Sequence, residues 1–368
     1  MRCVSEQRSL SSYTEDPSDV PVVTDDTLTA PFTRLGHDAV VALLERGWGI
    51  EAARLDRLAT ERDDSYVMTA RDGSRGIVKI AHPLDDPAVL ELQCTALLHA
   101  SERDPGLPLP RLIPDLDGGV LREVMGADGE PRHARLLSYL DGSTLDYDAT
   151  TAAQRRAIGR AAGRLSLALS DLEHGAARRV LAWDLQQVGP LRALVGVVAD
   201  PHARDAVEVE FEAYDCAVGA ALRATRQQIV HNDLNADNLL VDASADDYVT
   251  GILDFGDVVH SSVVGDLAVA MAYAVGADHA LERHHVDPWV APYDIAAGFA
   301  EVRALEDDEV AMLPALVRVR LAQRLVLNSW LAASDPANAG YTGRSITRTS
   351  RALQRLGAAP SPLDTAGG

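Results

Sequence analysis

The chain has 368 residues, enough for two modest domains, and its 47% hydrophobic and 24% charged residues are typical of globular proteins. With 34 basic and 55 acidic residues the formal net charge is −21, and so acidic a surface repels phosphate backbones and anionic lipid headgroups, which argues against nucleic-acid and membrane partners. The charge would suit a cationic substrate, although ordinary solvated surface carboxylates explain it at least equally well.

Cysteine usage and hydropathy predict a cytoplasmic protein. The three cysteines are widely spaced and form neither a disulfide framework nor a CxxC pair. The N-terminal residues contain no basic segment followed by an apolar core, so no secretory signal is expected. No run reaches the roughly 18 apolar residues that span a membrane, because Asp266 interrupts the most apolar stretch, Val263–Ala277.

The first part of the chain predicts a small β-rich lobe. Residues 1–33 are rich in Ser, Thr, Asp and Pro and are expected to form a flexible leader. Residues 34–140 are expected to form an antiparallel sheet with one helix before it and one inserted. The first helix is predicted at His37–Arg46, closed by Gly47, and the second from Asp86 and Pro87 to about Ala100. The predicted strands, with hairpin turns at residues 72–74 and 126–129, are Ala53–Leu58, Tyr66–Ala70, Gly76–Ile80, Gly119–Val124 and Ala134–Tyr139.

Beyond a linker at Leu140–Ser143 the periodicity becomes helical, and residues 141–357 are expected to form a larger, mainly helical lobe. A β-rich island at Ile229–Phe255 interrupts the helices, and residues 358–368 are expected to be a loose tail. The predicted helices before the island are Thr151–Leu172, Trp183–Val198 and Pro201–Thr225. We find no internal repeats.

Two motifs in the β-rich island carry the chemistry. HNDLNADN at residues 231–238 and LDFGD at residues 253–257 each follow an apolar, strand-like segment. Phosphoryl transfer requires a positioned acceptor hydroxyl and cations that neutralise charge on the phosphates. Mg²⁺ prefers oxygen ligands, typically one or two protein side chains with phosphate oxygens and water. We therefore expect Asp233 to orient or deprotonate the acceptor, and Asn238 and Asp254 to hold Mg²⁺.

Together these motifs resemble the catalytic and metal loops of the aminoglycoside phosphotransferase and choline kinase-like superfamily, and most closely those of the hydroxylysine kinase-like branch. Singly, Asp233 and Asn238 could be an Asx turn and a loop cap; jointly the motifs are specific. The resemblance covers about residues 36–357. It implies an α+β, protein kinase-like fold of two lobes, with ATP or GTP and Mg²⁺ bound between them.

The resemblance also implies nucleotide contacts in the N-terminal lobe. Lys79, the only lysine of the chain, ends an apolar strand and corresponds to the lysine that holds the α- and β-phosphates. Residues 58–66 resemble the hairpin that covers the phosphates, where Ser65 and backbone amides would touch them and Arg62 could add charge. For Glu61 and Asp63 in this hairpin we favour a solvated tip.

The helix partner of Lys79 and the adenine contacts are less clearly marked. Both Glu91 and Gln93 lie on the following helix, and the family register favours Gln93 slightly. Residues 137–142 resemble the adenine-binding linker, in which backbone groups of Ser138 to Leu140 would contact the base.

Further residues around the motifs have structural and functional interpretations. His231 and Asp266 are expected to brace the catalytic loop. Asp257 and His260 lie in a segment, residues 257–262, that resembles the one lining the acceptor side in the hydroxylysine kinase-like branch. A helix-capping serine in this segment and a surface histidine are equally good interpretations. On the C-terminal helix, Arg320 and Arg324 could border the acceptor pocket, although its apolar residues indicate core packing.

The acceptor is expected to be a small hydroxylated molecule with an amine, such as a hydroxylated amino acid or amino alcohol. Two rival functions remain: inactivation of an antibiotic such as an aminoglycoside or basic peptide, and a catalytically silent nucleotide-binding regulator. A protein kinase is disfavoured because no Ala-Pro-Glu segment or long activation loop follows Asp254.

Overall fold

The computed structural model describes residues 30, 32–58, 60, 63–126, 128–275, 287–334 and 339–358, without the side chains of residues 339–342 and 358. Most of the expected leader and tail, with Glu61 and Arg62 of the predicted phosphate hairpin, lie outside these residues. Among the residues described, no helix is long and apolar enough to cross a membrane.

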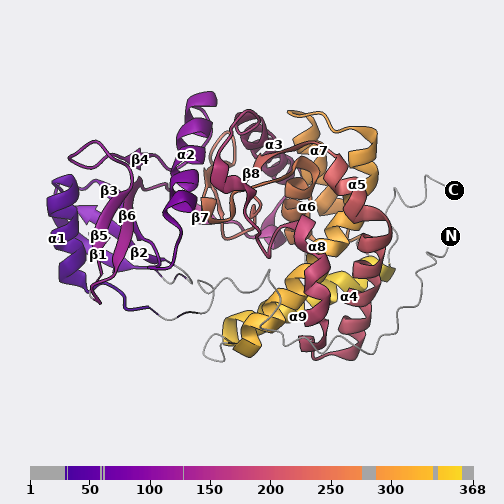
Figure 1. The fold of residues 1–368 in the computed structure, drawn as a ribbon. Coiled ribbons are helices and arrows are strands. Elements are labelled where there is room, and N and C mark those ends of the chain that lie inside the picture. The colour runs from indigo at the N-terminus through magenta and orange to yellow at the C-terminus, as the bar shows by residue number, and fades with distance from the viewer. Residues whose placement is uncertain are drawn as a thin grey trace.

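The N-terminal part is an antiparallel sheet with a helix before it (Figure 1). The strand order is β1-β2-β3-β6-β4, and β5 also pairs with β6. The helices are α1 (His37–Trp48) and α2 (Pro87–Arg103). The strands are β1 (Ala52–Arg57), β2 (Asp64–Ala70), β3 (Arg75–Ile80), β4 (Leu112–Ile113), β5 (Arg122–Met125) and β6 (Pro131–Ser138).

The alternation of side chains along β3 decides which face of the sheet carries the charge. Val78 and Ile80 are fully buried in a core shared with Leu44 of α1. Because successive strand residues point to opposite faces, Lys79 points away from α1. In Figure 1, α1 lies on the side of the sheet far from the helical part of the molecule. Lys79 is therefore directed toward the rest of the protein.

The predicted elements of this part are present with shifted ends. Asp86 caps α2 through Ala88 N, and the hairpin turn contains Gly73 at φ 86°. The expected end of α1 at Gly47 is wrong, since the helix continues to Trp48 and ends at Gly49, which has φ 67°. Gly49 supplies the left-handed conformation that a glycine adopts without strain.

The remainder is mainly helical, so the expected α+β class is confirmed. The helix α3 crosses α7 at two glycines: a Cβ on Gly159 or Gly298 would lie 2.0 Å from a backbone oxygen of the other helix. The helices of this part are α3 (Ala152–Ala168), α4 (Pro201–Ala213), α5 (Gly219–Ala224), α6 (Val263–Ala274), α7 (Val290–Ala300), α8 (Asp307–Ser334) and α9 (Ala339–Ala358).

Two helix predictions differ from the structure. The segment predicted as a helix at Trp183–Val198 forms two 3₁₀ segments, Leu185–Gln187 and Gly189–Val197. Gly189 and Pro190 favour a break there, because proline lacks the N–H that an α-helix uses. The helix predicted over Thr151–Leu172 is capped by Thr151 and already ends at Ala168.

Short strands frame the motif loops. β8 (Gln227–Val230) pairs with β11 (Val259–Ser262), while β9 (Leu239–Val241) lies between β7 (Ser143–Thr144) and β10 (Val249–Ile252). β11 was not predicted, because its four residues lie outside the apolar island and include polar ones. These pairings bring residues 231–238 and 253–257 together.

Candidate active site

Asp266 fixes the catalytic loop to the first turn of α6. Its Oδ1 accepts a hydrogen bond of 2.7 Å from the N–H of Asn232, whose φ of 65° lies in the left-handed region. Burial raises the pKa of Asp266 to about 6, against the opposing effect of the loop N–H groups. The predicted bracing role of Asp266 is therefore present in the geometry.

His231 links the two motif loops from inside the protein. One ring nitrogen, Nε2, lies 2.9 Å from the carbonyl oxygen of Leu253, and Nδ1 accepts from the N–H of Asp233 at 3.3 Å. The side chain is fully buried, and burial lowers the pKa of His231 to about 4. The ring is thus neutral with its proton on Nε2, and it orients the loops as predicted.

Asp233 and Asn238 contact each other directly across the catalytic loop. Asn238 Nδ2 donates to Asp233 Oδ2 at 2.7 Å and to the Asp233 backbone oxygen at 2.9 Å, and Asn235 Nδ2 donates to Oδ2 at 2.9 Å. Because the amide nitrogen of Asn238 is used in these bonds, its Oδ1 is the atom that remains for a cation.

Asp233 lies among charges of both signs. Burial raises the pKa of Asp233 well above its ordinary value, and the neighbouring Asp257 raises it further. The guanidinium of Arg320, 4.0 Å from Asp233 Oδ1, opposes this shift. In its ionised form, a carboxylate whose pKa is raised is a stronger base and is better suited to accept a proton from a hydroxyl.

Asp254 lies beside Asn238 because the strands that precede and follow the two loops are paired. Leu253 N donates to Asn238 O at 2.8 Å, and Ile252 is opposite Leu239 in the β9–β10 ladder. Asp254 itself has φ 54°, and its Oδ1 accepts from Gly256 N at 3.0 Å. Its side chain is 49% exposed, so a carboxylate oxygen is accessible from the cleft.

Lys79 connects the sheet to this loop. Its Nζ lies 3.6 Å from Asp254 Oδ2 and 3.1 Å from Asp63 Oδ2. Burial acts to lower the pKa of Lys79, but the two carboxylates outweigh it and raise the pKa above its ordinary value. Lys79 in turn lowers the pKa of Asp254 to about 2, so both groups are charged at neutral pH.

In this structure Lys79 pairs with a residue other than the predicted helix partner, whose role stays a prediction. Gln93 is buried, its Oε1 has no hydrogen-bond partner, and Glu91 is exposed on α2. The partner is Asp63, which is 15% exposed rather than a solvated tip and also lies 3.8 Å from Arg135. Lys79 and Arg135 are opposite each other in the β3–β6 ladder, so Asp63 lies against two cations from neighbouring strands.

Two other predicted nucleotide contacts need correction. Ser65 is 1% exposed and opposite Lys79 in the β2–β3 ladder, and its hydroxyl has no hydrogen-bond partner. It is therefore too deeply buried in this structure to touch a phosphate. Ser138 exchanges hydrogen bonds with the backbone of Arg111, which leaves its N–H occupied. Leu140 makes no backbone hydrogen bond to any residue described, and its contact with a base stays a prediction.

The predicted acceptor residues occupy different positions. Asp257 is close enough to Asp233 to raise its pKa. His260 lies on β11 near the buried Asp184, whose Oδ1 accepts from Ser261 at 2.7 Å. The structure thus brings Asp257, rather than His260, to the catalytic carboxylate.

Two arginines that support the site were missed or only mentioned in passing. Arg179 donates to the backbone oxygens of Gly256 and Val258, directly after the predicted metal ligand. Arg320 is fully buried beneath Asp233 and donates to the Trp183 backbone oxygen. Neither residue lies in a motif, and no local pattern in the sequence marks them; the fold alone brings them to the loops.

The donor set fits a hard divalent cation shared with phosphates. No three His, Cys, Asp or Glu side chains of the described part are grouped so that they could hold a metal alone. The strand pairing instead places the loop with the amide oxygen of Asn238 beside the loop with the half-exposed carboxylate of Asp254. This is the small protein contribution expected for Mg²⁺ whose other ligands are phosphate oxygens and water.

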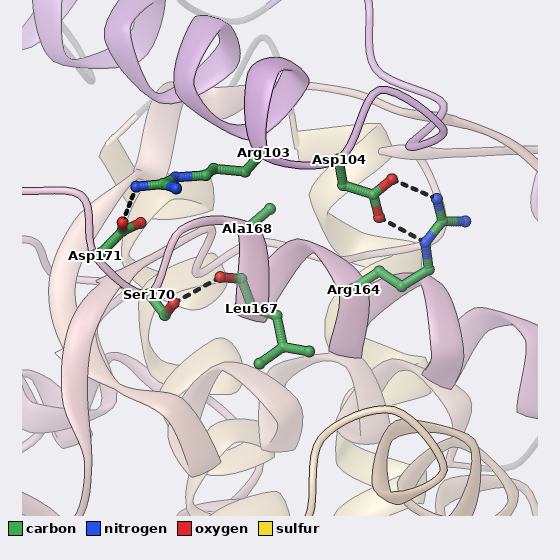
Figure 2. Close-up of a pocket in the computed structure, with 7 residues that line it drawn as sticks. All are labelled: Arg103, Asp104, Arg164, Leu167, Ala168, Ser170 and Asp171. Carbon is green, nitrogen blue, oxygen red and sulfur yellow. Dashed lines mark hydrogen bonds and ion pairs between the residues drawn. The ribbon is translucent and has the colours of Figure 1, made fainter.

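A separate pocket between α2 and α3 is occupied by charges that neutralise each other. Figure 2 shows Asp104 accepting two hydrogen bonds from Arg164, each 2.8 Å, and Arg103 paired with Asp171. These pairs tie the helix after β3 to the helical part of the molecule. Because its charges are satisfied internally, the pocket offers no evident ligand chemistry.

Comparison with known proteins agrees with this geometry. Residues 57–307 match the model of the phosphotransferase enzyme family. Hydroxylysine kinase of Danio rerio is 27% identical over 333 residues, which cover 88% of this chain and 91% of the relative. Hydroxylysine kinase of Mus musculus is 26% identical over 337 residues, covering 86% and 87%.

Solved structures share the fold at lower sequence identity. An amicoumacin kinase, in complex with AMP-PNP, Ca²⁺ and Ami, superposes with a TM-score of 0.67 at 14% identity, covering 90% of this chain and 98% of that one. A microcompartment-associated aminopropanol kinase gives 0.60 at 20% identity, covering 86% and 95%. The expected kinase-like architecture is thereby confirmed.

Proposed function

Since this chain belongs to the phosphotransferase enzyme family, and is a small-molecule kinase, we propose that it transfers the γ-phosphoryl group of ATP or GTP to a hydroxyl of an amine-bearing acceptor in a Mg²⁺-dependent reaction. One observation supports this proposal above the others. Asp233, Asn238 and Asp254 converge at one edge of paired strands, with Lys79 3.6 Å from Asp254.

Asp233 acts on the acceptor. Its Oδ2 is held by two amide donors, while Oδ1 is the oxygen nearer to Arg320. In its ionised form this carboxylate, a stronger base because its pKa is raised, accepts the proton of the acceptor hydroxyl as the hydroxyl oxygen bonds to the γ-phosphorus and the bond from that phosphorus to the leaving nucleoside diphosphate breaks. The pairing with Asn238 keeps it in one orientation, so little reorganisation is required during transfer.

Asn238 Oδ1 and the Asp254 carboxylate would hold Mg²⁺, which supplies positive charge that neutralises the phosphates during transfer. Arg179 keeps the Asp254 loop in place through its backbone oxygens. Asn238 is fixed from both sides, since its amide group bonds Asp233 and its backbone oxygen accepts from Leu253.

Lys79 and Arg135 provide the positive surface for the triphosphate. In this structure the carboxylate of Asp63 lies between them, at 3.1 and 3.8 Å. A bound phosphate would share these cations with Asp63. We therefore propose that Asp63 positions Lys79 in the place that a helix glutamate fills in the kinase pattern.

The acceptor class is supported by the relatives' names and by charge. Hydroxylysine and aminopropanol each combine an amine with a hydroxyl, and kinases for both are similar to this chain. The net charge of −21 and the proximity of Asp257 to Asp233 favour a cationic group beside the reacting hydroxyl.

The test is a nucleotide-consumption screen of hydroxyamino acids, amino alcohols, aminoglycosides and basic peptides, each with ATP and with GTP. Product phosphate esters are identified by mass spectrometry, and Asp233→Asn measures the background. We expect Mg²⁺-dependent phosphorylation of a hydroxyamino acid or amino alcohol. Turnover confined to antibiotics would support the inactivating kinase instead, and no turnover with intact nucleotide binding would support the silent regulator.

A further inference from the structure

The face of α8 beneath the catalytic loop carries two arginines one turn apart. Arg320 is fully buried, lies 4.0 Å from Asp233 Oδ1 and is bonded to the Trp183 backbone oxygen. Residues four apart lie on the same face of a helix, so Arg324 lies on the same face of α8 as Arg320. In Figure 1, α8 lies in the helical part, on the far side of the motif strands from the N-terminal sheet.

Arg324 has an aromatic neighbour but no ion-pair partner within the part of the chain that the structure describes. Its guanidinium carbon lies 3.8 Å from the centre of the Tyr273 ring on α6. Among the residues that the structure describes, it makes no ion pair, and its burial is intermediate. Other shielded arginines of the same part are neutralised: Arg155 pairs with Asp294 and Arg226 with Glu309.

Positive charges lie near Arg324 as well as negative ones. Burial lowers the pKa of Arg324, as do the positive charges of Arg320 and Arg348, while Tyr273 and Asp233 oppose this shift. Arg320 is balanced by Asp233, and Arg348 lies 3.7 Å from Asp148. A partly buried guanidinium without a carboxylate is unfavourable unless a ligand supplies the anion.

Arg324 and the cations proposed to bind the triphosphate have different neighbours. The groups that influence its charge are Tyr273, Arg320, Asp233 and Arg348, all from the helical part. Lys79, in contrast, is influenced by Asp254, Asp63 and Arg135. The triphosphate cations and Arg324 thus belong to different neighbourhoods that meet at the catalytic loop.

Resting on the proposed function, we propose that Arg324 binds a carboxylate of the acceptor and so selects hydroxylated amino acids over amino alcohols that lack this group. Asp257 and Arg324 carry opposite charges, and each interacts electrostatically with Asp233. A zwitterion can place its ammonium near Asp257, its hydroxyl at Asp233 and its carboxylate on the planar fork of Arg324. The ring of Tyr273 holds the guanidinium plane in position for that contact.

The test uses two acceptors that differ in a single charge. Hydroxylysine and its carboxamide share the skeleton, the amines and the hydroxyl, but the amide lacks the carboxylate. Initial rates with Mg²⁺ and ATP give kcat and KM for wild type, Arg324→Gln and Arg324→Lys, with Arg351→Gln on the exposed face of α9 as control. Thermal unfolding and nucleotide affinity show whether each variant is folded.

We expect wild type to favour the acid over the amide by at least about tenfold in kcat/KM, mainly through KM. Arg324→Gln should lower kcat/KM for the acid about 100-fold while changing the amide less than about threefold. Arg324→Lys keeps the charge but loses the two-pronged guanidinium contact, so its kcat/KM for the acid should lie between those of wild type and Arg324→Gln. Arg351→Gln should match wild type.

Equal losses for acid and amide in Arg324→Gln would overturn the inference, because they indicate a purely structural arginine. Equal use of both acceptors by wild type would also overturn it, while leaving the proposed kinase function intact. If wild type phosphorylates neither these acceptors nor any amino alcohol, the proposed function fails, and this role of Arg324 fails with it.

Discussion

The catalytic loop and the nucleotide side of the N-terminal sheet hold their polar groups in different ways. In the loop, Asp233 accepts hydrogen bonds from two side-chain amides, and both ring nitrogens of His231 take part in hydrogen bonds. On the sheet side, the hydroxyl of Ser65 and Oε1 of Gln93 are buried without a hydrogen-bond partner, and in the loop only the side-chain nitrogen of Asn232 is in the same state. Leaving such a group unsatisfied costs about 1–3 kcal/mol.

The two regions differ in what holds their charged groups. In the loop, Asp233 and Asn238 are hydrogen-bonded to each other, and the proposed catalysis would use that preorganised arrangement. On the sheet side, the carboxylate of Asp63 forms ion pairs with both Lys79 and Arg135. We therefore expect substitutions in the loop to affect turnover strongly, and substitutions on the sheet side to have graded effects.

The largest effect is expected from Asp233→Asn, which keeps the shape of the loop and removes the proton acceptor. The kcat should fall by about 10³-fold or more, since general base catalysis contributes 10²–10⁴-fold, while nucleotide affinity stays unchanged. Steady-state rates and equilibrium binding check this, with Asp246→Asn, at an exposed position outside the motif loops, as control. Activity close to wild type would exclude Asp233 from the chemistry.

Asp254→Ala should act on metal-dependent nucleotide binding rather than on the proton. Loss of an accessible carboxylate ligand should weaken Mg²⁺–nucleotide affinity by about 100-fold, and affinity without Mg²⁺ should change little. Calorimetric titrations with and without Mg²⁺ measure both, and Asp246→Ala, an exposed carboxylate in the β9–β10 turn, is the control. Unchanged affinity in Mg²⁺ would remove Asp254 from the metal site.

Asp63→Asn sharpens the comparison on the sheet side. It should lower kcat about tenfold, because Lys79 loses the 3.1 Å contact that positions it, and change nucleotide affinity by less than about threefold. Asp72→Asn, in the exposed hairpin turn, should have no effect. A greater loss in Gln93→Ala than in Asp63→Asn would restore the helix residue as the partner of Lys79.

The smallest expected effect concerns stability and pH. The folded state lowers the pKa of His231 from 6.5 to about 4, so the unfolded chain binds more protons in this interval. The resulting stability is fully present above pH 6.5 and is lost as the pH falls toward 4. Between pH 7 and pH 5 we expect His231 to contribute a loss of about 2 kcal/mol in the free energy of unfolding.

Urea unfolding of wild type and His231→Gln at both pH values isolates this contribution. The variant should be less stable at pH 7 because its loop contacts are altered, but its stability should fall less on acidification. An identical pH dependence in the two proteins would show that His231 is not held neutral by burial.

The sequence predicted the parts of the molecule that depend on local patterns. The two motif loops and the cap of α2 at Asp86 follow from residue type and spacing, and the structure brings Asp233, Asn238 and Asp254 together. The hairpin through Gly73 was likewise marked by its turn residues.

What the sequence did not predict depends on contacts between distant segments. Asp63 was taken for a solvated tip because nothing local shows that Lys79 and Arg135 lie against it. Arg179 lies between α3 and the 3₁₀ segment that begins at Leu185, and Arg320 lies on α8. Each makes a hydrogen bond to a residue more than 70 positions away in the sequence. Gln93 was chosen because its position on α2 matches the family's sequence pattern. In the structure its side-chain oxygen is buried and has no hydrogen-bond partner.

The central claim is that one amide and one carboxylate of paired loops hold the metal beside a catalytic carboxylate. A crystal structure with AMP-PNP and Mg²⁺ tests it most directly. We predict Asn238 Oδ1 and an oxygen of Asp254 at about 2.1 Å from Mg²⁺, with Asp233 facing the γ-phosphate. Bound phosphates and metal that lie away from these three side chains would contradict the account.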